Sequence, residues 1–344
     1  MIQQDIIPAR DPNVIRAELN EQLLLRKTNR AGNEIYTFHA TDAPNTMLEI
    51  GRLREIAFRG SGGGTGLAAD IDHHDMDKDG YRQLVVWDAK KSELIGGYRY
   101  MLGGEVHRKG DQTDLSSNEI FHFSETFIEE YIPKSIELGR SFVKMEEKNG
   151  QMMPVSIFAL DNLWDGLGGL MLIHDDYQYF FGKVTMYSDY NKRAKDLIAY
   201  YLQTYFQGDQ ELIRPLYPIE IEMPLAEMQS VILGKDPKDD YKQLSKVIRN
   251  MGTVIPPLVN AYIGLSNSLM YFGTSVNPHF GDVEETAIMV PMEDISADKR
   301  RRHIESFIRD ASNKINPNIL SKIKRRLGLW SNKDKANSDN ISVE

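Results

Sequence analysis

The chain has 344 residues, of which 41% are hydrophobic and 26% charged, so it can bury a large core as one big domain or two. It contains no cysteine, which excludes disulfides, thiolate catalysis and cysteine-based zinc sites and fits a reducing compartment. The net charge of −9 argues against a general nucleic-acid-binding protein. Neither a basic nor an apolar segment follows the first methionine, so we expect no signal peptide and a cytoplasmic protein.

The first predicted elements are two helices with a short strand between them. Asp11 and Pro12 are typical of a helix start, and leucines at helical spacing predict a helix over 13–26. Aromatic and β-branched residues predict a strand over 34–39. The second helix is predicted from about residue 42 to residue 58.

A glycine-rich segment follows this second helix. Five of the seven residues 60–66 are glycine, which predicts a mobile loop because glycine populates many backbone conformations. The segment is not a P-loop, since it lacks the closing Gly-Lys-Ser/Thr. It is not a dinucleotide-binding fingerprint either, which needs a preceding strand and a different glycine spacing.

The acidic segment 70–80 resembles two motifs without completing either. Asp75, Asp77 and Asp79 match the opening of a calcium loop, but the twelfth position is Val86 instead of Glu, so we expect no metal. Four residues separate His74 from Asp79, which is the H-x4-D spacing of glycerolipid acyltransferases. No second motif supports that spacing.

The middle of the chain alternates strands and helices. A hairpin is predicted over 82–88 and 93–102, followed by a short amphipathic helix near 125–131. Further along we expect a strand over 135–144, a loop over 145–153, a helix over 155–173, a strand over 179–186 and a helix over 191–206. The tyrosines of the last helix, Tyr200, Tyr201 and Tyr205, are expected to line the core.

The predicted strand 135–144 carries a glutamate and an arginine within an alternating pattern. Alternation places Glu137 and Gly139 on one face and Arg140 on the other. A bulge or splay near Gly139 would bring the two charged side chains to a common cleft. An ordinary sheet strand with solvated charges is the alternative.

The last part of the chain separates an uncharged stretch from a basic one. Residues 251–281 contain no Lys, Arg, Asp or Glu, but prolines and amides interrupt them, so we expect a buried helix and strand lining an apolar slot and no membrane span. Helices are predicted over 296–312 and 317–327, and a disordered tail over 331–344. Residues 299–326 hold ten Lys/Arg and two Asp/Glu, a local charge of +8. This composition suits an anionic membrane surface or an acidic protein partner, although a solvated helix face is equally compatible.

An ordered set of short motifs resembles a known family. The set is Arg54-x-x-x-Phe58, Asp72-x-x-Asp75, Gly96-Gly97-Tyr98-Arg99, Glu137-Leu138-Gly139-Arg140, Leu163-Trp164-x-Gly166-Leu167, Tyr179-x-Phe181-Gly182, Pro257-Leu258-x-x-x-Tyr262 and Phe280-Gly281-Asp282. Across residues 34–292 it resembles the GNAT-like N-acyltransferases of the ornithine-lipid, hemolysin-like branch, which are related to acyl-homoserine lactone synthases. The aromatic residue that signal synthases place after the Arg-x-x-x-Phe pair is replaced here by the glycine loop.

The resemblance implies an α/β fold of the α+β kind, with a mixed and strongly bent central sheet flanked by helices. We expect an N-terminal helical extension over 1–30, the GNAT-like domain over 31–295, basic C-terminal helices over 296–330 and a disordered tail over 331–344. The resemblance further implies transfer of a fatty acyl group, often 3-hydroxylated, from acyl carrier protein to the amine of an amino acid, glycine or ornithine. The product would be a lyso-aminolipid. The functional set carried over is Arg54, Phe58, Asp72, Asp75, Arg99, Glu137 and Arg140.

Acid–base chemistry is consistent with this set. A free α-amine has a pKa of about 7.7–8.0, so Glu137 could remove its proton directly or through a water. Arg99 or Arg140 offers a planar fork for the acceptor carboxylate. Ion pairing with Asp72 or Asp75 is the structural alternative for these arginines.

The donor is expected to be carried on the phosphopantetheine of acyl carrier protein, with no permanently bound cofactor. The segment 146–151 lacks the glycine spacing that cradles the diphosphate of coenzyme A, and its two glutamates would repel that group. The rival functions are acylation of another amine, as in a signal synthase, and a non-enzymatic, membrane-associated binding protein. Peripheral contact of the basic segment with the inner face of the cell membrane is a further expectation.

Overall fold

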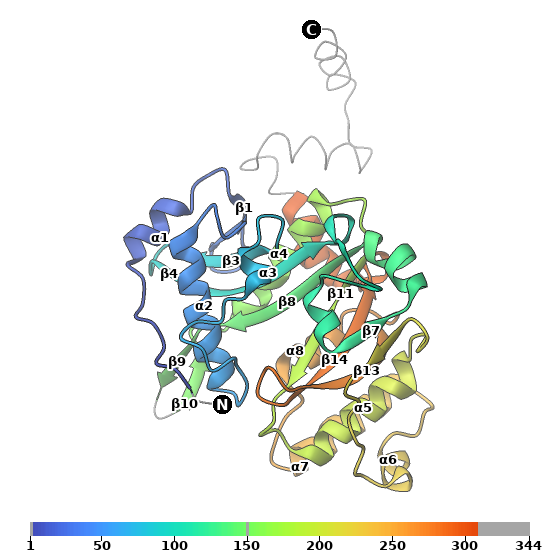
Figure 1. The fold of residues 1–344 in the computed structure, drawn as a ribbon. Coiled ribbons are helices and arrows are strands. Elements are labelled where there is room, and N and C mark those ends of the chain that lie inside the picture. Colours follow the sequence, from blue (N-terminus) through green and yellow to red (C-terminus); the bar gives the residue numbers. More distant parts are fainter. Residues whose placement is uncertain (1–2, 149–150, 309–344) are drawn as a thin grey trace.

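The computed structural model describes residues 3–148 and 151–308, and these are built around a sheet of eight strands (Figure 1). All neighbouring strands are antiparallel except β8 and β11, which are parallel. In spatial order the strands are β1 (Leu24–Lys27), β2 (Glu34–Phe38), β3 (Arg82–Asp88), β4 (Glu93–Leu102), β8 (Ser135–Val143), β11 (Tyr179–Met186), β14 (Val283–Pro291) and β13 (Met270–Asn277). The expected mixed sheet flanked by helices is confirmed.

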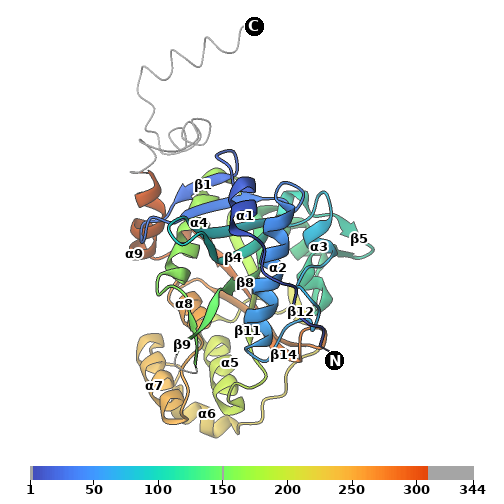
Figure 2. The ribbon, with the colours of Figure 1, turned by 90° about the vertical axis from the view of Figure 1, so that its left-hand side faces the viewer.

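Helices cover both faces of this sheet (Figure 2). On one face α2 (Pro44–Arg59) packs over β2 and β3, preceded by α1 (Pro12–Glu18) and followed by α3 (His73–Met76). The other face holds the largest apolar core, formed with α4 (Ala159–Ile173), α5 (Lys192–Phe206), α7 (Pro237–Asn250) and α8 (Pro257–Ile263). The described residues also form two short helices, α6 (Leu225–Val231) and α9 (Ala297–Lys299).

An insertion between β4 and β8 shares the α2 face. It contains β5 (Arg108–Lys109), β6 (Gln112–Thr113), β7 (Phe121–Phe123) and a helical turn, Phe127–Tyr131. Its phenylalanines pack against Phe181 of β11 and Phe272 of β13. Strand β12 (Ile213–Pro215) pairs with β7. The insertion and α2 therefore lie on the same face, on either side of the middle of the sheet.

The parallel pair β8 and β11 is joined over only part of its length. The register runs from Tyr179 opposite Ser135 to Gly182 opposite Leu138, and between these two described strands no pairing continues beyond that point. Strand β8 extends to Val143 and β11 to Met186, so their carboxyl-terminal halves separate. We call this opening the β8–β11 split.

A β-bulge lies on β8 at the start of the split. On β4 one residue, Tyr98, lies between Gly97 and Arg99, whereas on β8 two residues, Arg140 and Ser141, lie between their partners Gly139 and Phe142. The extra residue leaves Arg140 with a positive φ of 48°, a conformation that residues with a Cβ seldom adopt. The bulge expected near Gly139 is therefore confirmed, one residue further along.

Two sequence predictions about secondary structure are wrong. The helix expected over 13–26 ends at Glu18, and Leu24–Lys27 form β1, because pairing with β2 and burial of Leu25 outweigh helical spacing. The loop expected over 145–153 is a hairpin of β9 (Met145–Lys148) and β10 (Gln151–Pro154). Glu146 and Glu147 are residues that strands rarely contain, so the sequence pattern does not predict a strand there. Helix α4 starts at Ala159, later than the predicted residue 155.

Other predictions are confirmed. The uncharged stretch contains α8 and β13, and Tyr201 is buried in the main core. Helical turns run through residues 297–308, while the helix predicted over 317–327 and the tail lie outside the described residues. Within residues 3–148 and 151–308, no helix has the length and apolar character needed to cross a bilayer. The division into extension, central domain and C-terminal helices stays a prediction.

Polar contacts join the beginning and the end of the described chain. The Arg26 guanidinium of β1 donates to the carbonyls of His303, at 2.9 Å, and Asp165, at 3.3 Å. The Asp165 carboxylate contacts Nδ1 of His303 at 2.8 Å and accepts from the backbone of Asn29 at 2.7 Å. This cluster fastens the edge strand β1 to α4 and to the helical turns after α9.

The close approach at the start of the split leads to the first prediction. A Cβ on Gly182 would lie 2.5 Å from the carbonyl oxygen of Leu138, so Gly182→Ala must push β8 and β11 apart. We expect it to destabilise the fold by about 1–3 kcal/mol, as overpacking does. Chemical denaturation measures this. The control is Gly264→Ala, whose Cβ would meet its nearest neighbour at 3.5 Å, and equal stability of the two variants would contradict the prediction.

Candidate active site

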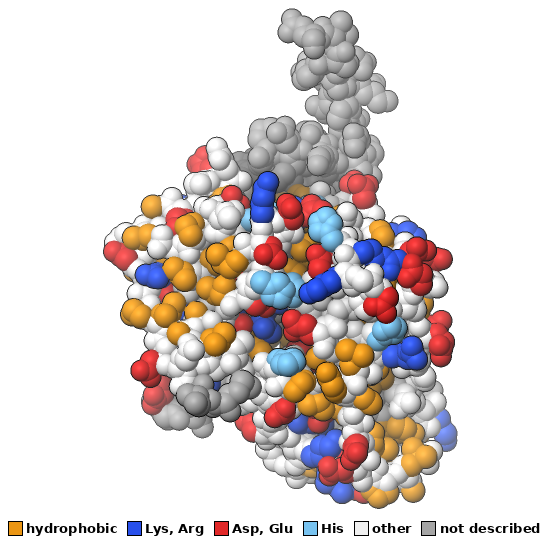
Figure 3. Space-filling model, viewed as in Figure 1, with side chains coloured by type: hydrophobic (Ala, Val, Ile, Leu, Met, Phe, Trp, Pro, Cys, Tyr) orange, Lys and Arg blue, Asp and Glu red, His pale blue; other side chains and the backbone are white. Residues whose placement is uncertain are grey.

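The seven predicted site residues all lie on the face that α2 and the insertion cover. Arg54 and Phe58 come from α2, Asp72 and Asp75 from the start of α3, Arg99 from β4, and Glu137 and Arg140 from β8. Charged and histidine side chains gather along the middle of this face (Figure 3). The fold therefore brings together residues that are more than eighty positions apart in the sequence.

An inner ion-pair cluster is fully buried. Both oxygens of Asp75 lie 3.1 Å from a guanidinium nitrogen of Arg54, and the amide of Gln83 bridges the two side chains at 2.6 and 2.9 Å. Arg99 approaches Asp75 at 3.2 Å. Arg54 and Asp75 are closed off from solvent, and we infer that their contacts hold α2, α3, β3 and β4 together.

An outer cluster is partly accessible. Arg99 binds both oxygens of Asp72 at 2.8 Å, and Arg140 lies 3.0 Å from Asp70 and 3.8 Å from Asp72. The Asp72 side chain is 27% exposed and that of Arg140 is 16% exposed. The ion pairing of Arg99 with Asp72 and Asp75, which the sequence left as an alternative, is confirmed. Asp72 and Arg140 are the members of the two clusters that a small molecule reaches most directly.

Aromatic rings hold Arg140 in place. Its guanidinium lies 4.4 Å from the centre of the Phe280 ring, and Phe280 packs edge-on against Phe58 at 5.2 Å. A cation over an aromatic face is stabilised by the ring quadrupole. Phe58 thus packs against the Phe280 ring, and the Phe280 ring in turn contacts the Arg140 guanidinium.

Glu137 is buried, with 3% exposure, and both of its oxygens accept hydrogen bonds from hydroxyl groups. Tyr81 donates to one oxygen and Ser117 to the other. The Tyr81 ring also lies under the Arg99 guanidinium at 4.7 Å. Glu137 is thus connected to Arg140 through Tyr81, Arg99 and Asp72, although the sequence suggested a shared cleft.

A further polar group lies across the split from Glu137. Lys183 of β11 pairs with Glu285 of β14 at 3.1 Å, and Glu285 also accepts from Asn277 at 2.8 Å and Thr185 at 3.1 Å. Sequence reasoning missed Lys183 and Glu285, together with Asp70, Tyr81 and Ser117. A lone lysine in the apolar strand 179–186 and two glutamates in the apolar strand 283–291 were the available signals.

The charges shift the pKa values of these acids in different directions. Burial alone would raise the pKa of Asp75, but Arg54 and Arg99 outweigh it and hold that pKa well below its ordinary value. At Asp70 burial dominates, and its pKa is raised despite Arg140. Contact with His74 lowers the pKa of Glu119 to about 2. The surroundings of Asp75 therefore favour its ionised form, whereas burial favours the neutral form of Asp70.

The acidic segment does not form the motifs that it resembles. His74 contacts Glu119 at 3.5 Å instead of Asp79, and the Asp75 oxygens are taken by Arg54, Arg99 and Gln83. In the described part of the chain, no group of three or more His, Cys, Asp or Glu side chains is placed to hold a metal ion.

The glycine loop is anchored on the buried carboxylate of Glu55. Glu55 accepts from the backbone of Thr65 at 3.1 Å, from the Thr65 hydroxyl at 2.8 Å and from the backbone of Gly66 at 2.9 Å. The sequence predicts a mobile loop over residues 60–66. Any movement of this loop away from α2 would break these three hydrogen bonds to Glu55. At its centre Gly63 packs on the Tyr187 ring and on Gly281.

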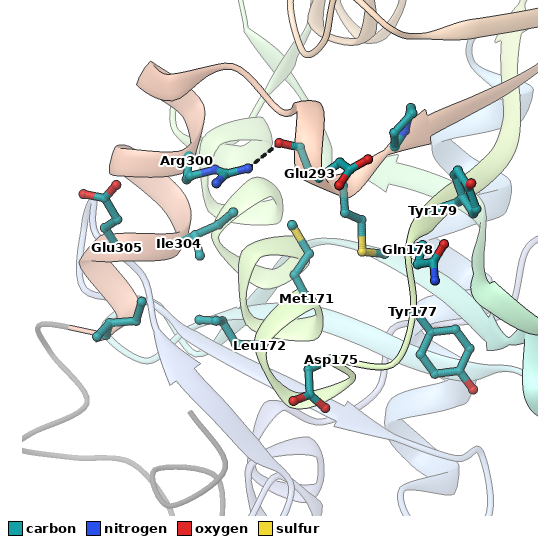
Figure 4. Close-up of a pocket in the computed structure, with 13 residues that line it drawn as sticks. Met171, Leu172, Asp175, Tyr177, Gln178, Tyr179, Glu293, Arg300, Ile304 and Glu305 are labelled. Atoms are coloured by element: carbon teal, nitrogen blue, oxygen red, sulfur yellow. Dashed lines mark hydrogen bonds between the residues drawn. The ribbon is translucent and has the colours of Figure 1, made fainter. Parts of the chain in front are cut away.

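A cavity of about 500 Å³ lies at the other end of the sheet (Figure 4). Met171, Met292 and Ile304 give it an apolar wall, and Arg300 at its rim donates to the carbonyl of Glu293. None of the seven site residues lines it. The cavity is therefore separate from the charged clusters at the split.

The chain is similar to a known domain family and to two bacterial proteins. Residues 53–157 match the acetyltransferase (GNAT) domain family, and this range covers the site from α2 to the hairpin β9–β10. A glycine N(alpha)-acyltransferase of Bacteroides thetaiotaomicron is 47% identical over 306 residues, which are 89% of this chain and 91% of that protein. One from Phocaeicola vulgatus is also 47% identical, over 89% of this chain and 94% of its own length. No solved structure matches the chain.

The inner ion pair leads to a stability prediction. Asp75→Asn leaves Arg54 buried beside a neutral group, and we expect a loss of about 3–5 kcal/mol in the free energy of unfolding. Because the pKa of Asp75 is lowered in the fold, its stabilisation is present above about pH 4 and is lost as the pH falls through the folded-state pKa.

Chemical denaturation at neutral and acidic pH tests this prediction. The control is Asp239→Asn, which removes a carboxylate from an exposed pair with Lys242 and should change stability little. A loss in Asp75→Asn that is no larger than in this control would contradict the structural role.

Proposed function

Because the chain belongs to the same family as these two glycine N(alpha)-acyltransferases, a family of acyltransferases with a GNAT domain, we propose that it transfers a fatty acyl group to the α-amine of glycine. The observation that carries the proposal is the 47% identity over 89% of the chain, which includes the whole charged site. Ornithine, the other acceptor that the motifs suggest, is the second candidate. The relation to ornithine-lipid enzymes and acyl-homoserine lactone synthases stays part of this proposal.

The β8–β11 split is the proposed place of reaction. The pairing of β8 with β11 stops at Gly182, and we place the arm of the thioester beside β8 beyond this point, with backbone N–H groups of the bulge as the proposed donors. Such groups would stabilise the negative charge on the carbonyl oxygen during attack. The amine nitrogen bonds to the carbonyl carbon, the carbon–sulfur bond breaks, and the donor leaves as a thiol.

Glu137 is the proposed acid–base residue. It accepts one proton from the attacking amine, directly or through a water, and a proton returns to the leaving sulfur. Its hydroxyl partners Tyr81 and Ser117 support this role because they fix the carboxylate and can exchange places with a substrate donor. Arg140, at the accessible end of the outer cluster, is proposed to bind the acceptor carboxylate. Asp72 would orient Arg99 and Arg140.

Acyl carrier protein is the proposed donor carrier. Glu146 and Glu147 lie in β9, where a diphosphate would meet negative charge. A phosphopantetheine arm has no diphosphate next to the protein and avoids this repulsion. The donor is a substrate, so no permanently bound cofactor is required.

A lyso-aminolipid product and peripheral contact with a membrane complete the proposal. The described basic residues are engaged within the protein, since Arg301 pairs with Asp298 and Arg302 lies 2.6 Å from Asp161. The remaining basic residues of 309–326 lie outside the described residues. Membrane attraction is therefore proposed on charge alone.

The acyl transfer assay is the direct test. Purified protein with a long-chain acyl carrier protein thioester and glycine should release thiol and form N-acylglycine, identified by mass spectrometry. We expect glycine to exceed ornithine, and the carrier-protein thioester to exceed the coenzyme A thioester, in kcat/KM. Absence of N-acyl amino acid with every donor would overturn the proposed function.

The role of Glu137 has its own prediction. Glu137→Gln keeps the size of the side chain but not its basicity, and we expect kcat to fall by about 10²–10⁴-fold while the protein stays folded. Glu137→Ala should behave similarly. The control is Glu211→Gln on the exposed segment before β12, and activity of Glu137→Gln within a fewfold of this control would rule out the assignment.

A further inference from the structure

Asp70 is a buried acid whose carboxylate accepts no hydrogen bond from the described residues. Its side chain is 1% exposed, and no described residue donates a hydrogen bond to either of its carboxylate oxygens. Nε of Arg140 lies 3.0 Å away, but it too is left without a hydrogen bond, so the contact is an ion pair only. Buried carboxylates normally accept several hydrogen bonds, because burial without them is unfavourable.

Four other carboxylates near the split accept hydrogen bonds. Asp72 is bound by Arg99, and Asp75 by Arg54 and Gln83. Glu137 accepts two hydroxyl groups, and Glu285 accepts from a lysine, an amide and a hydroxyl. Asp70 thus differs from these four acids, because it can take a new donor without losing a hydrogen bond.

The chain places this open acid beside the guanidinium of Arg140. The backbone N–H of Asp70 donates to the carbonyl of Gly51 on α2 at 2.9 Å, which fixes Asp70 between α2 and the bulge of β8. Arg140 spans from the bulge to the Phe280 ring, next to the split. A carboxylate and a guanidinium therefore stand side by side next to the split, the proposed place of reaction.

We propose that Asp70 and Arg140 together bind the acceptor amino acid as a zwitterion. Asp70 accepts hydrogen bonds from the ammonium group, and Arg140 donates to the carboxylate. One carbon separates the two charges of an α-amino acid, so its binding site needs opposite charges close together, as these two side chains are. The inference rests on the proposed function and adds a binding residue that the sequence motifs do not include.

The enclosure of the pair favours a small acceptor. Gly63 of the glycine loop lies 3.1 Å from the Cβ position of Gly281, next to Phe280, whose ring covers the Arg140 guanidinium. Asp70 itself is 1% exposed, so neighbouring residues must shift before an acceptor reaches it. Glycine brings both charges with no side chain to accommodate, whereas a larger amino acid must also find room in this enclosed place.

Binding and proton removal are separate roles in this arrangement. An ammonium held by Asp70 retains protons that point elsewhere, and one of them passes to Glu137 directly or through a water. Loss of Asp70 should therefore act on KM for the acceptor, whereas loss of Glu137 acts on kcat. Since burial already disfavours the charged form of Asp70, Asp70→Asn should fold and melt no lower than the wild type.

Kinetics with glycine and glycinamide test the proposal, because glycinamide keeps the amine but lacks the carboxylate charge. Asp70→Asn should raise KM about 10- to 100-fold for both acceptors, the effect of losing a charge-assisted hydrogen bond. Arg140→Gln should raise KM for glycine but not for glycinamide. The KM for the acyl donor should not change in Asp70→Asn, and the control Asp239→Asn should resemble the wild type.

An unchanged KM for glycine in folded Asp70→Asn would overturn the inference and leave the acyltransferase proposal standing. A wild-type protein that acylates no amino acid would remove the proposed function itself. If Asp70→Asn does not fold, thermal melts of the wild type decide: glycine should raise Tm, while acetate at equal concentration, which has no ammonium, should not. Equal shifts by glycine and acetate would also overturn the zwitterion site.

Discussion

The buried contact between Arg54 and Asp75 is the interaction on which the rest of the site depends. It joins α2 to α3 and, through Gln83 and Arg99, to the two strands beneath them. An arginine in this position without its acid would be a charge in a low-dielectric interior, so the four elements are stable only together. Arg99 connects Asp75 to Asp72, and Arg140 lies next to Asp72 and Asp70. The inner ion pair therefore helps to set the positions of these more accessible residues.

Much of the fold can be predicted from the sequence, because most strands are short runs of apolar or aromatic residues with their own turn signals. Strands β3, β4 and β11 fall at the predicted positions for this reason. Strand β1 exists through its pairing with β2, and no local pattern over Leu24–Lys27 reveals it. The hairpin β9–β10 was missed likewise, since its stability comes from one strand pairing with the other and not from a periodic face.

The site could be predicted only where its residues share a segment. Glu137 and Arg140 stand out because they are charged positions in one strand, and the glycine between them suggests the bulge. Tyr81, Ser117, Lys183 and Asp70 are ordinary in their own segments and acquire meaning through partners on other elements. The distinction between a buried, satisfied acid such as Asp75 and a buried, open one such as Asp70 is a property of three-dimensional contacts alone.

The fastening of β1 to the far end of the chain bears on the order in which the protein is made. Arg26 donates to a carbonyl that lies 277 positions later, at His303. At about 5–20 residues per second, a ribosome needs roughly 14–55 s to synthesise the intervening chain. Before His303 is made, β1 can pair with β2 and contact α4, but it lacks its contacts with the turns after α9, and an incompletely covered edge strand can pair with other chains. The edge of the sheet is therefore completed late in synthesis, and a nascent chain that stalls before His303 would be prone to association.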